Sequence, residues 1–125
     1  MKTILVIDSD PVTANLTEKF LKNYGYEVEV TSEGKDALDR LNRPRFDLVL
    51  SDTQLQGLAG FDILKIMKKC FINTPFVFLT ADDDEVTRME AEALGAARLI
   101  SKRREYINLP HILDQLFFSS REMVA

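Results

Sequence analysis

The sequence is short of the residues that build disulfides, metal clusters and membrane spans. It has one cysteine and one histidine, so an internal disulfide is excluded and no cluster has the spacing of a zinc site. No apolar run approaches the roughly 20 residues that cross a bilayer. A strand pattern begins directly after Met1, so we expect no signal peptide. These absences favour a globular protein of a reducing compartment, the cytoplasm.

Charge and size narrow the class further. Lys and Arg total 16 against 20 Asp and Glu, which gives a net charge of −4. Non-specific nucleic-acid binding needs a basic face, so we expect no direct nucleic-acid partner and no membrane partner for this domain. The 125 residues contain no repeat, linker or low-complexity tract. A single domain over residues 1–125 is therefore expected, with one good core.

Strand and helix patterns alternate five times along the chain. Short apolar or alternating runs predict strands at about residues 3–8, 26–30, 46–51, 75–79 and 98–101, and helical patterns separate or follow them. Asp10-Pro11 and Gly25 have the residue types that start and stop the first helix. Alternation with short connections predicts an α/β fold, a parallel sheet with helices on both faces.

Helical spacing also predicts which side chains face the core. The first helix is expected to bury residues spaced by four, namely Val12, Leu16, Phe20 and Tyr24. The third is expected to bury Leu64, Met67 and Phe71, with Cys70 as a small buried residue at its end. The last helix carries Ile112, Leu113, Leu116 and Phe117 at core spacing, and because Phe117 and Phe118 cannot both face the core, one of the two is expected to be exposed.

Four apolar runs end on polar residues. Asp8, Asp52, Thr80 and Lys102 each follow or close a predicted strand. In open α/β sheets the ligand crevice lies at the carboxyl ends of the strands. We therefore expect these four side chains to converge, with the chemistry at Asp52.

The segments that carry these residues closely resemble the receiver domain of bacterial two-component response regulators. They are Ile-Leu-Val-Ile-Asp-Ser-Asp-Pro at 4–11, Asp-Leu-Val-Leu-Ser-Asp at 47–52, Leu-Thr-Ala at 79–81, Leu-Gly-Ala at 94–96 and Ile-Ser-Lys at 100–102. Each alone is weak, but all five occur in order at the family's spacing. The resemblance implies a flavodoxin-like (βα)5 doubly wound parallel sheet with strand order 2-1-3-4-5.

The resemblance also implies roles for the residues that match the family's motifs. Asp52 would accept a phosphoryl group from a sensor histidine kinase or a phosphotransfer protein. Asp8, Asp52 and the backbone carbonyl of Gln54 would hold Mg²⁺, and Lys102 would pair with a phosphate oxygen. Thr80 would move toward the phosphate and shift the face formed by the fourth helix, fifth strand and last helix. That face would bind a downstream effector or form a homodimer. The resemblance thus implies a phospho-accepting signalling domain and not an enzyme.

Several positions depart from the family's pattern. Ser9 replaces an acidic metal ligand, so weak Mg²⁺ binding is expected. Ser9 and Asp10 stay candidates for the missing ligand, although the N-cap role is favoured for Asp10. Leu99 replaces an aromatic residue that reports the threonine shift. Arg103 replaces a proline, so a trans peptide bond and a rearranged loop are expected after Lys102.

Other hypotheses stay open at this point. The departures favour an atypical receiver that works as a phosphorylation-independent interaction module. Asp8-Ser9-Asp10 also fits the Asp-x-Asp motif of haloacid-dehalogenase-like phosphatases, with Asp8 as nucleophile, but that leaves Asp52 unexplained. A flavodoxin is disfavoured because Asp8 and Asp10 would repel the flavin phosphate. The run at 82–84 is interpreted as a solvated helix start in preference to a cation site.

Overall fold

The computed structural model describes residues 1–124, with side chains through Ser119. Its described residues form one parallel sheet in the order β2-β1-β3-β4-β5. The strands are β1 (Thr3–Ile7), β2 (Glu27–Thr31), β3 (Leu48–Ser51), β4 (Phe76–Thr80) and β5 (Arg98–Ser101). The helices are α1 (Pro11–Asn23), α2 (Gly34–Leu41), α3 (Gly60–Lys69), α4 (Glu85–Ala93), the short 3₁₀ helix η1 (Tyr106–Asn108) and α5 (Leu109–Val124). The α/β fold is as the sequence patterns predict, and the strand order is as the family resemblance implies.

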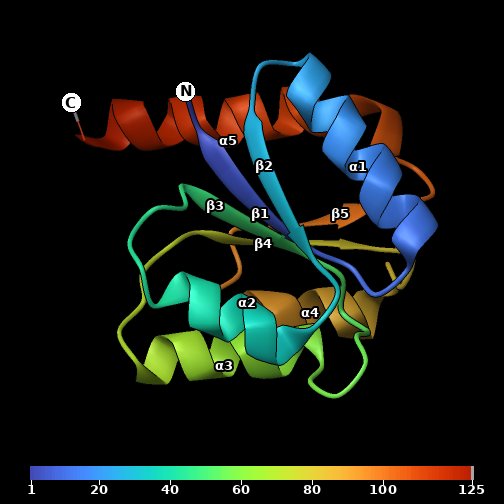
Figure 1. Ribbon diagram of the computed structural model, residues 1–125, viewed down its shortest axis with the longest axis vertical. Helices are drawn as coiled ribbons and strands as arrows, with labels where there is room; N and C mark the ends of the chain where they lie inside the picture. The colour runs from blue at the N-terminus through green and yellow to red at the C-terminus, as the bar shows by residue number, and fades with distance from the viewer. Residues whose placement is uncertain (125) are drawn as a thin grey trace.

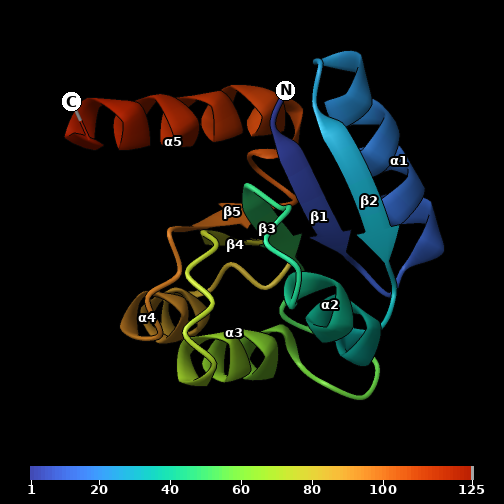
Figure 2. The ribbon, with the colours of Figure 1, turned by 60° about the vertical axis from the view of Figure 1, so that its left-hand side comes forward.

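The helices cover both faces of the sheet. Helices α1 and α5 lie on one face, and α2, α3 and α4 lie on the other (Figures 1 and 2). Alternate residues of each strand enter the two layers, so Ile4 and Val6 join the core under α1 and α5 while Leu5 and Ile7 join the opposite core. The central strand β3 is buried along its whole length, as its continuous apolar run predicts. No described helix is long and apolar enough to cross a membrane.

The predicted core face of α1 is wrong. Val12 is 67% exposed and Leu16 is 56% exposed, and Tyr24 also faces solvent. The residues that α1 buries are Ala14, Thr17 and Leu21, with Phe20 partly buried beside them. The small side chains of Ala14 and Thr17 line the side of the helix that packs on the sheet, and the Thr17 hydroxyl is paired with Tyr106. Of the residues selected by the spacing-by-four pattern, only Phe20 therefore reaches the core.

The predicted burial at the end of α3 is also wrong. Leu64 and Met67 are buried as expected, but Phe71 is 86% exposed and Cys70 is exposed. The helix ends at Lys69, and the Phe71 N–H then donates to the Lys68 carbonyl while the Ile72 N–H donates to the Met67 carbonyl. This is a Schellman motif, which places Phe71 at a left-handed φ of 58°. That conformation turns Phe71 outward and lets Ile72 pack on the core in its place.

The last helix matches its prediction. Ile112 and Leu113 are buried in α5, and Leu116 and Phe117 pack partly buried against the same core. Phe118 is exposed, so the two adjacent phenylalanines divide between core and solvent as helical geometry requires.

Candidate functional site

The strand order brings the chain's acidic strand ends together. β1 and β3 are neighbours at the centre of the sheet, so Asp8 and Asp52 follow adjacent strands at the same edge. The Asp52 N–H donates to the Ile7 carbonyl at 3.0 Å, which continues the ladder by one more bond. Lys102 follows β5, and its N–H donates to the Thr80 carbonyl at 2.8 Å. The carboxyl edge therefore holds all four residues that close the apolar runs.

Lys102 bridges the two carboxylates. Its Nζ donates to Asp52 Oδ2 at 2.7 Å and to Asp8 Oδ2 at 3.0 Å. The Lys102 side chain is only 18% exposed. Burial alone would lower the pKa of the Lys102 ammonium, but the hydrogen bond and charge of Asp52, followed by those of Asp8, outweigh it and hold the pKa above its usual value. The side chain is therefore a fixed positive charge between two fixed acids.

The main chain orients the Asp52 carboxylate. Oδ1 accepts the Thr53 N–H at 2.7 Å and faces the Gln54 N–H at 3.4 Å, which leaves Oδ2 on the side of Lys102 and Asp8. Gly60 supports this loop, because its N–H donates to the Thr53 carbonyl at 2.9 Å. A Cβ at Gly60 would collide with the main-chain carbonyl of Asp52 and meet the Phe78 ring at 3.1 Å. A glycine is therefore needed where α3 begins.

Thr80 does not contact Asp52 directly. Its hydroxyl lies 2.9 Å from the hydroxyl of Thr53, and Thr53 Oγ1 in turn lies 3.4 Å from Asp52 Oδ1. Both threonines are buried. Sequence reasoning missed Thr53 altogether. The sequence feature that could have indicated Thr53 is a hydroxyl-bearing residue directly after Asp52, close enough to the end of β3 to be buried.

Asp10 caps the first helix. Its carboxylate accepts the Thr13 hydroxyl at 2.6 Å and the Val12 N–H at 3.2 Å, and these hydrogen bonds lower the pKa of Asp10, the Thr13 hydroxyl most. The Asp10 N–H donates to Asp8 Oδ1 at 2.9 Å. The predicted N-cap is therefore present, and the Asp10 side chain is engaged in its own helix.

The carboxylates of the site suit a hard cation, although they offer it few protein ligands. Within the part of the chain that the structure describes, no three His, Cys, Asp or Glu side chains gather closely enough to hold a metal. Asp8 and Asp52 do lie close enough to share the Lys102 ammonium. Carboxylate and carbonyl oxygens are the ligands that Mg²⁺ prefers. The two carboxylates are therefore of the kind that fits a magnesium ion, with one acidic ligand fewer than the family's pattern.

The segment after Lys102 is held by side chains in place of a proline. The Lys102–Arg103 peptide bond is trans, as expected. Glu105 accepts the Ser101 N–H at 3.1 Å and the Arg98 guanidinium at 2.7 Å. Burial would raise the pKa of Glu105, but these two donors lower it below its usual value. The Arg103 guanidinium donates to the Ala81 carbonyl at 3.0 Å, which ties the segment to the loop after β4.

The three aspartates at 82–84 have separate roles, which the interpretation as a solvated helix start did not foresee. Only Asp84 caps α4, where it accepts the Thr87 N–H at 2.9 Å. Asp83 accepts the Ser101 hydroxyl at 2.7 Å, and this bond, with the charges of nearby arginines, lowers the pKa of Asp83. Asp82 accepts the Gln54 side-chain amide at 3.0 Å. Two of the three thus connect the loop after β4 to the loop after β3 and to the last residue of β5.

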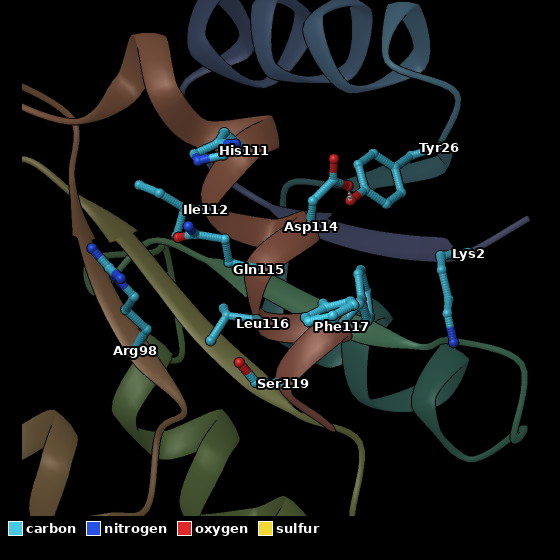
Figure 3. Close-up of a pocket in the computed structure, with 11 residues that line it drawn as sticks. Lys2, Tyr26, Arg98, His111, Ile112, Asp114, Gln115, Leu116, Phe117 and Ser119 are labelled. Atoms are coloured by element: carbon cyan, nitrogen blue, oxygen red, sulfur yellow. Dashed lines mark hydrogen bonds between the residues drawn. The ribbon is translucent and has the colours of Figure 1, made fainter. Parts of the chain in front are cut away.

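A groove lies elsewhere on the molecule. It has a volume of about 770 Å³ and runs along α5, between Tyr26, Asp114 and Lys2 on one side and Arg98 and His111 on the other (Figure 3). Lys2 and Tyr26 precede β1 and β2, and Arg98 begins β5, so the groove lies at the amino ends of the strands. It is at the opposite edge of the sheet from Asp52 and contributes nothing to the acidic site.

Five parallel strands in the order 2-1-3-4-5, alternating with five helices in the described residues, define the flavodoxin-like class. Within that class, the sequence profile described as "Response regulator receiver domain" matches residues 4–114. The chain belongs to the response regulator receiver domain family.

Individual relatives agree with this membership. The transcriptional regulatory protein CrdR of Helicobacter pylori is 34% identical over 116 residues, which are 92% of this chain and 51% of CrdR. The chain thus spans about half the length of this curated relative. The receiver domain of Francisella response regulator 1452 is 27% identical, with a TM-score of 0.89 over 96% of this chain and 99% of that one. Response regulator TrrA of Thermotoga maritima, solved in complex with Mg²⁺ and BeF, is 26% identical, with a TM-score of 0.81 over 93% of this chain and 99% of TrrA.

Proposed function

We propose that this domain accepts a phosphoryl group on Asp52, from the phosphohistidine of a sensor histidine kinase or phosphotransfer protein in the cytoplasm. The observation that carries the proposal is the Lys102 ammonium, which lies 2.7 Å from Asp52 Oδ2 and 3.0 Å from Asp8 Oδ2. A transferred phosphoryl group adds negative charge beside a carboxylate, and a fixed cation lowers the electrostatic cost of that charge. The domain acts as a phospho-accepting signalling module and not as an enzyme with turnover.

The chemistry is an in-line displacement at phosphorus. A carboxylate oxygen of Asp52 forms the new O–P bond as the N–P bond of the phosphohistidine breaks, and the electron pair of that bond returns to the imidazole. In the resting arrangement Oδ1 accepts the Thr53 N–H and Oδ2 accepts the Lys102 ammonium, so the oxygen that attacks phosphorus must give up one of these bonds. Lys102 then pairs with a phosphoryl oxygen, and Thr80 donates its hydroxyl to another.

Mg²⁺ would be held by Asp8, Asp52 and the Gln54 carbonyl. When bound, it supplies charge neutralisation at the phosphoryl oxygens. Ser9 offers a hydroxyl where a third acid would serve better, and Asp10 is engaged as the cap of α1. We therefore infer a weak affinity for Mg²⁺, so that the site fills only near millimolar concentrations. Gln54 has a second role in this proposal: it stands two residues after the acceptor, where a polar side chain would affect how long the acyl phosphate lasts.

The signal leaves through the face formed by α4, β5 and α5. Val86 and Met89 are exposed on α4, which gives this helix apolar side chains for a partner. Leu99 is buried under α4 in place of the family's aromatic residue. We propose that an effector protein or domain, or a second copy of the chain, binds this face.

Beryllofluoride, a stable mimic of a phosphoryl group on aspartate, tests the proposal. The ¹⁵N-labelled chain is titrated with it at millimolar Mg²⁺, and amide shifts are followed by NMR. We expect saturable shifts at residues 52, 80 and 102 that extend into α4, β5 and α5, and no saturable shift in Asp52→Asn. Asp47→Asn, at the other end of the same strand, is the matched control and should respond like the wild type.

A second candidate function is a phosphorylation-independent interaction module. The observation that favours it is the engagement of Asp10 in the α1 cap, which leaves only two carboxylates for a metal. This candidate gains if the titration gives no saturable shift in the wild-type chain at any millimolar Mg²⁺ concentration. Membership of the receiver family disfavours the haloacid-dehalogenase-like phosphatase and the flavodoxin.

A further inference from the structure

Two buried hydroxyl groups connect the residue after Asp52 with the last residue of β4. Thr53 is 4% exposed and Thr80 is 1% exposed, and their Oγ1 atoms lie 2.9 Å apart. β3 and β4 are adjacent parallel strands, so the pair lies across one strand interface at the carboxyl edge. Neither hydroxyl has access to bulk water, so each depends on protein partners for its hydrogen bonds.

The neighbouring partners fix the direction of the bond. Thr80 Oγ1 accepts the Asp82 N–H at 3.0 Å, and no acceptor for its proton other than Thr53 lies within hydrogen-bond distance among the described residues. Thr53 Oγ1 lies 3.4 Å from Asp52 Oδ1, a carboxylate oxygen that can only accept. The consistent assignment is that Thr80 donates to Thr53, and Thr53 donates to Asp52.

We propose that Thr53 is a positioning residue, which holds the Thr80 hydroxyl in the unphosphorylated state and so sets how readily the domain responds. This inference rests on the proposed function, in which Thr80 donates to a phosphoryl oxygen. Thr80 has one proton, so it must give up its bond to Thr53 before it can bond to the phosphoryl group. The buried bond is therefore present only in the resting arrangement and opposes the change.

Removal of the Thr53 hydroxyl has opposite effects on folding and on the response. In Thr53→Val the side chain keeps its shape, but the Thr80 proton loses its partner in the resting state. The resting state is destabilised, whereas the phosphoryl-bound state has already given up that bond. A hydroxyl that only supported the fold would lower stability and leave the affinity for a phosphoryl mimic unchanged.

The test measures the dissociation constant of beryllofluoride at fixed Mg²⁺ by NMR titration of the full chain. We expect Thr53→Val to bind roughly three- to tenfold more tightly than the wild type, the range given by one hydrogen bond. Thr53→Ser keeps the hydroxyl and should bind like the wild type. Thr31→Val, which removes another buried hydroxyl at the same edge without contact to Asp52, should leave the affinity unchanged.

A double-mutant cycle with Thr80→Val isolates the pair. With no hydroxyl at position 80, the change Thr53→Val should alter the affinity by less than about twofold. If the wild type binds beryllofluoride but Thr53→Val has an unchanged affinity, the role of Thr53 is overturned and the acceptor function stands. The same conclusion follows if Thr53→Val gains as much affinity in the Thr80→Val background as in the wild type. Absence of binding in the wild type would overturn both.

Discussion

The hydroxyls of Thr17 and Tyr106 lie 2.8 Å apart, 89 residues from one another in the chain. Thr17 is on the core side of α1, and Tyr106 begins η1, a few residues after Lys102. The Tyr106 ring also packs against Phe20 with their centroids 5.7 Å apart. One tyrosine thus attaches the segment after Lys102 to the first helix.

This contact predicts a specific loss of stability. Tyr106→Phe would leave the buried Thr17 hydroxyl without its partner, and we expect the free energy of unfolding to fall by about 1–2 kcal/mol in urea titrations. Adding Thr17→Val should cost little more, because both hydroxyls are then absent. Additive losses in the double variant would contradict the pairing.

The N-cap role of Asp10 in α1 predicts which substitutions change the affinity for Mg²⁺. Ser9→Asp supplies the missing acidic ligand and should tighten Mg²⁺ binding by about tenfold in an NMR titration. Asp10→Asn removes a charge but keeps an N-cap acceptor, so Mg²⁺ affinity should change by less than about twofold. A loss of affinity in Asp10→Asn as large as that in Asp8→Asn would identify Asp10 as a ligand.

The glycines of the loop after β3 differ in what surrounds them. Gly60→Ala places a methyl group against the Asp52 carbonyl, and we expect a loss of about 2–3 kcal/mol in unfolding free energy with weaker beryllofluoride binding. Gly57→Ala meets no atom within 4 Å but has a φ of +84°, so it should cost only about 1–2 kcal/mol and leave binding unchanged. Equal effects on binding from both variants would contradict the close approach at Gly60.

The C-terminal ends of α1, α3 and α4 predict a stabilising substitution. Gly25 and Gly95 take the left-handed position after α1 and α4, whereas Phe71 takes it after α3. Phe71→Gly should relieve the backbone penalty and raise the free energy of unfolding by about 0.5–1 kcal/mol, since glycine entropy in the unfolded chain offsets part of the gain. Gly25→Ala, with no atom within 4 Å of the new methyl group, should lower it by a similar amount. A loss of stability in Phe71→Gly would mean that the exposed ring contributes contacts of its own.

Tyr26 predicts how stability depends on alkaline pH. Burial, followed by its hydrogen bond to Asp114, raises the pKa of Tyr26 well above its ordinary value of 10.0. The unfolded chain then loses this proton at lower pH than the folded chain, so stability present below about pH 10 falls as the pH rises further. Between about pH 9 and pH 11 the wild type should lose about 1 kcal/mol more than Tyr26→Phe. Parallel curves for the two proteins would contradict the shift.

The fold and the three charged residues of the site follow from the sequence for the same reason. Parallel strands are short apolar runs, and their carboxyl ends meet at one edge, so Asp8, Asp52 and Lys102 could be placed together before any coordinates. The strand order itself came from the family resemblance. The roles of these residues stay predictions until the beryllofluoride titration is done.

Two of the remaining features depend on partners distant in sequence, and one depends on where a helix ends. Thr17 looks like a solvent-facing residue until Tyr106 provides its hydrogen bond, which is why the predicted face of α1 was wrong. Phe71 breaks the apolar spacing of α3 because the helix stops two residues earlier than the pattern suggests. Thr53 was overlooked because a hydroxyl after a strand is usually a turn residue, and only the position of Thr80 explains its burial.

The Lys102 bridge joins strand ends that are not adjacent. β5 is separated from β1 and β3 by β4, yet one ammonium group fastens its end to theirs. The ends of three strands should therefore open to solvent together, as a single unit in hydrogen exchange. Neutralisation of either aspartate would loosen all three at once, while the opposite rim of the sheet keeps its protection.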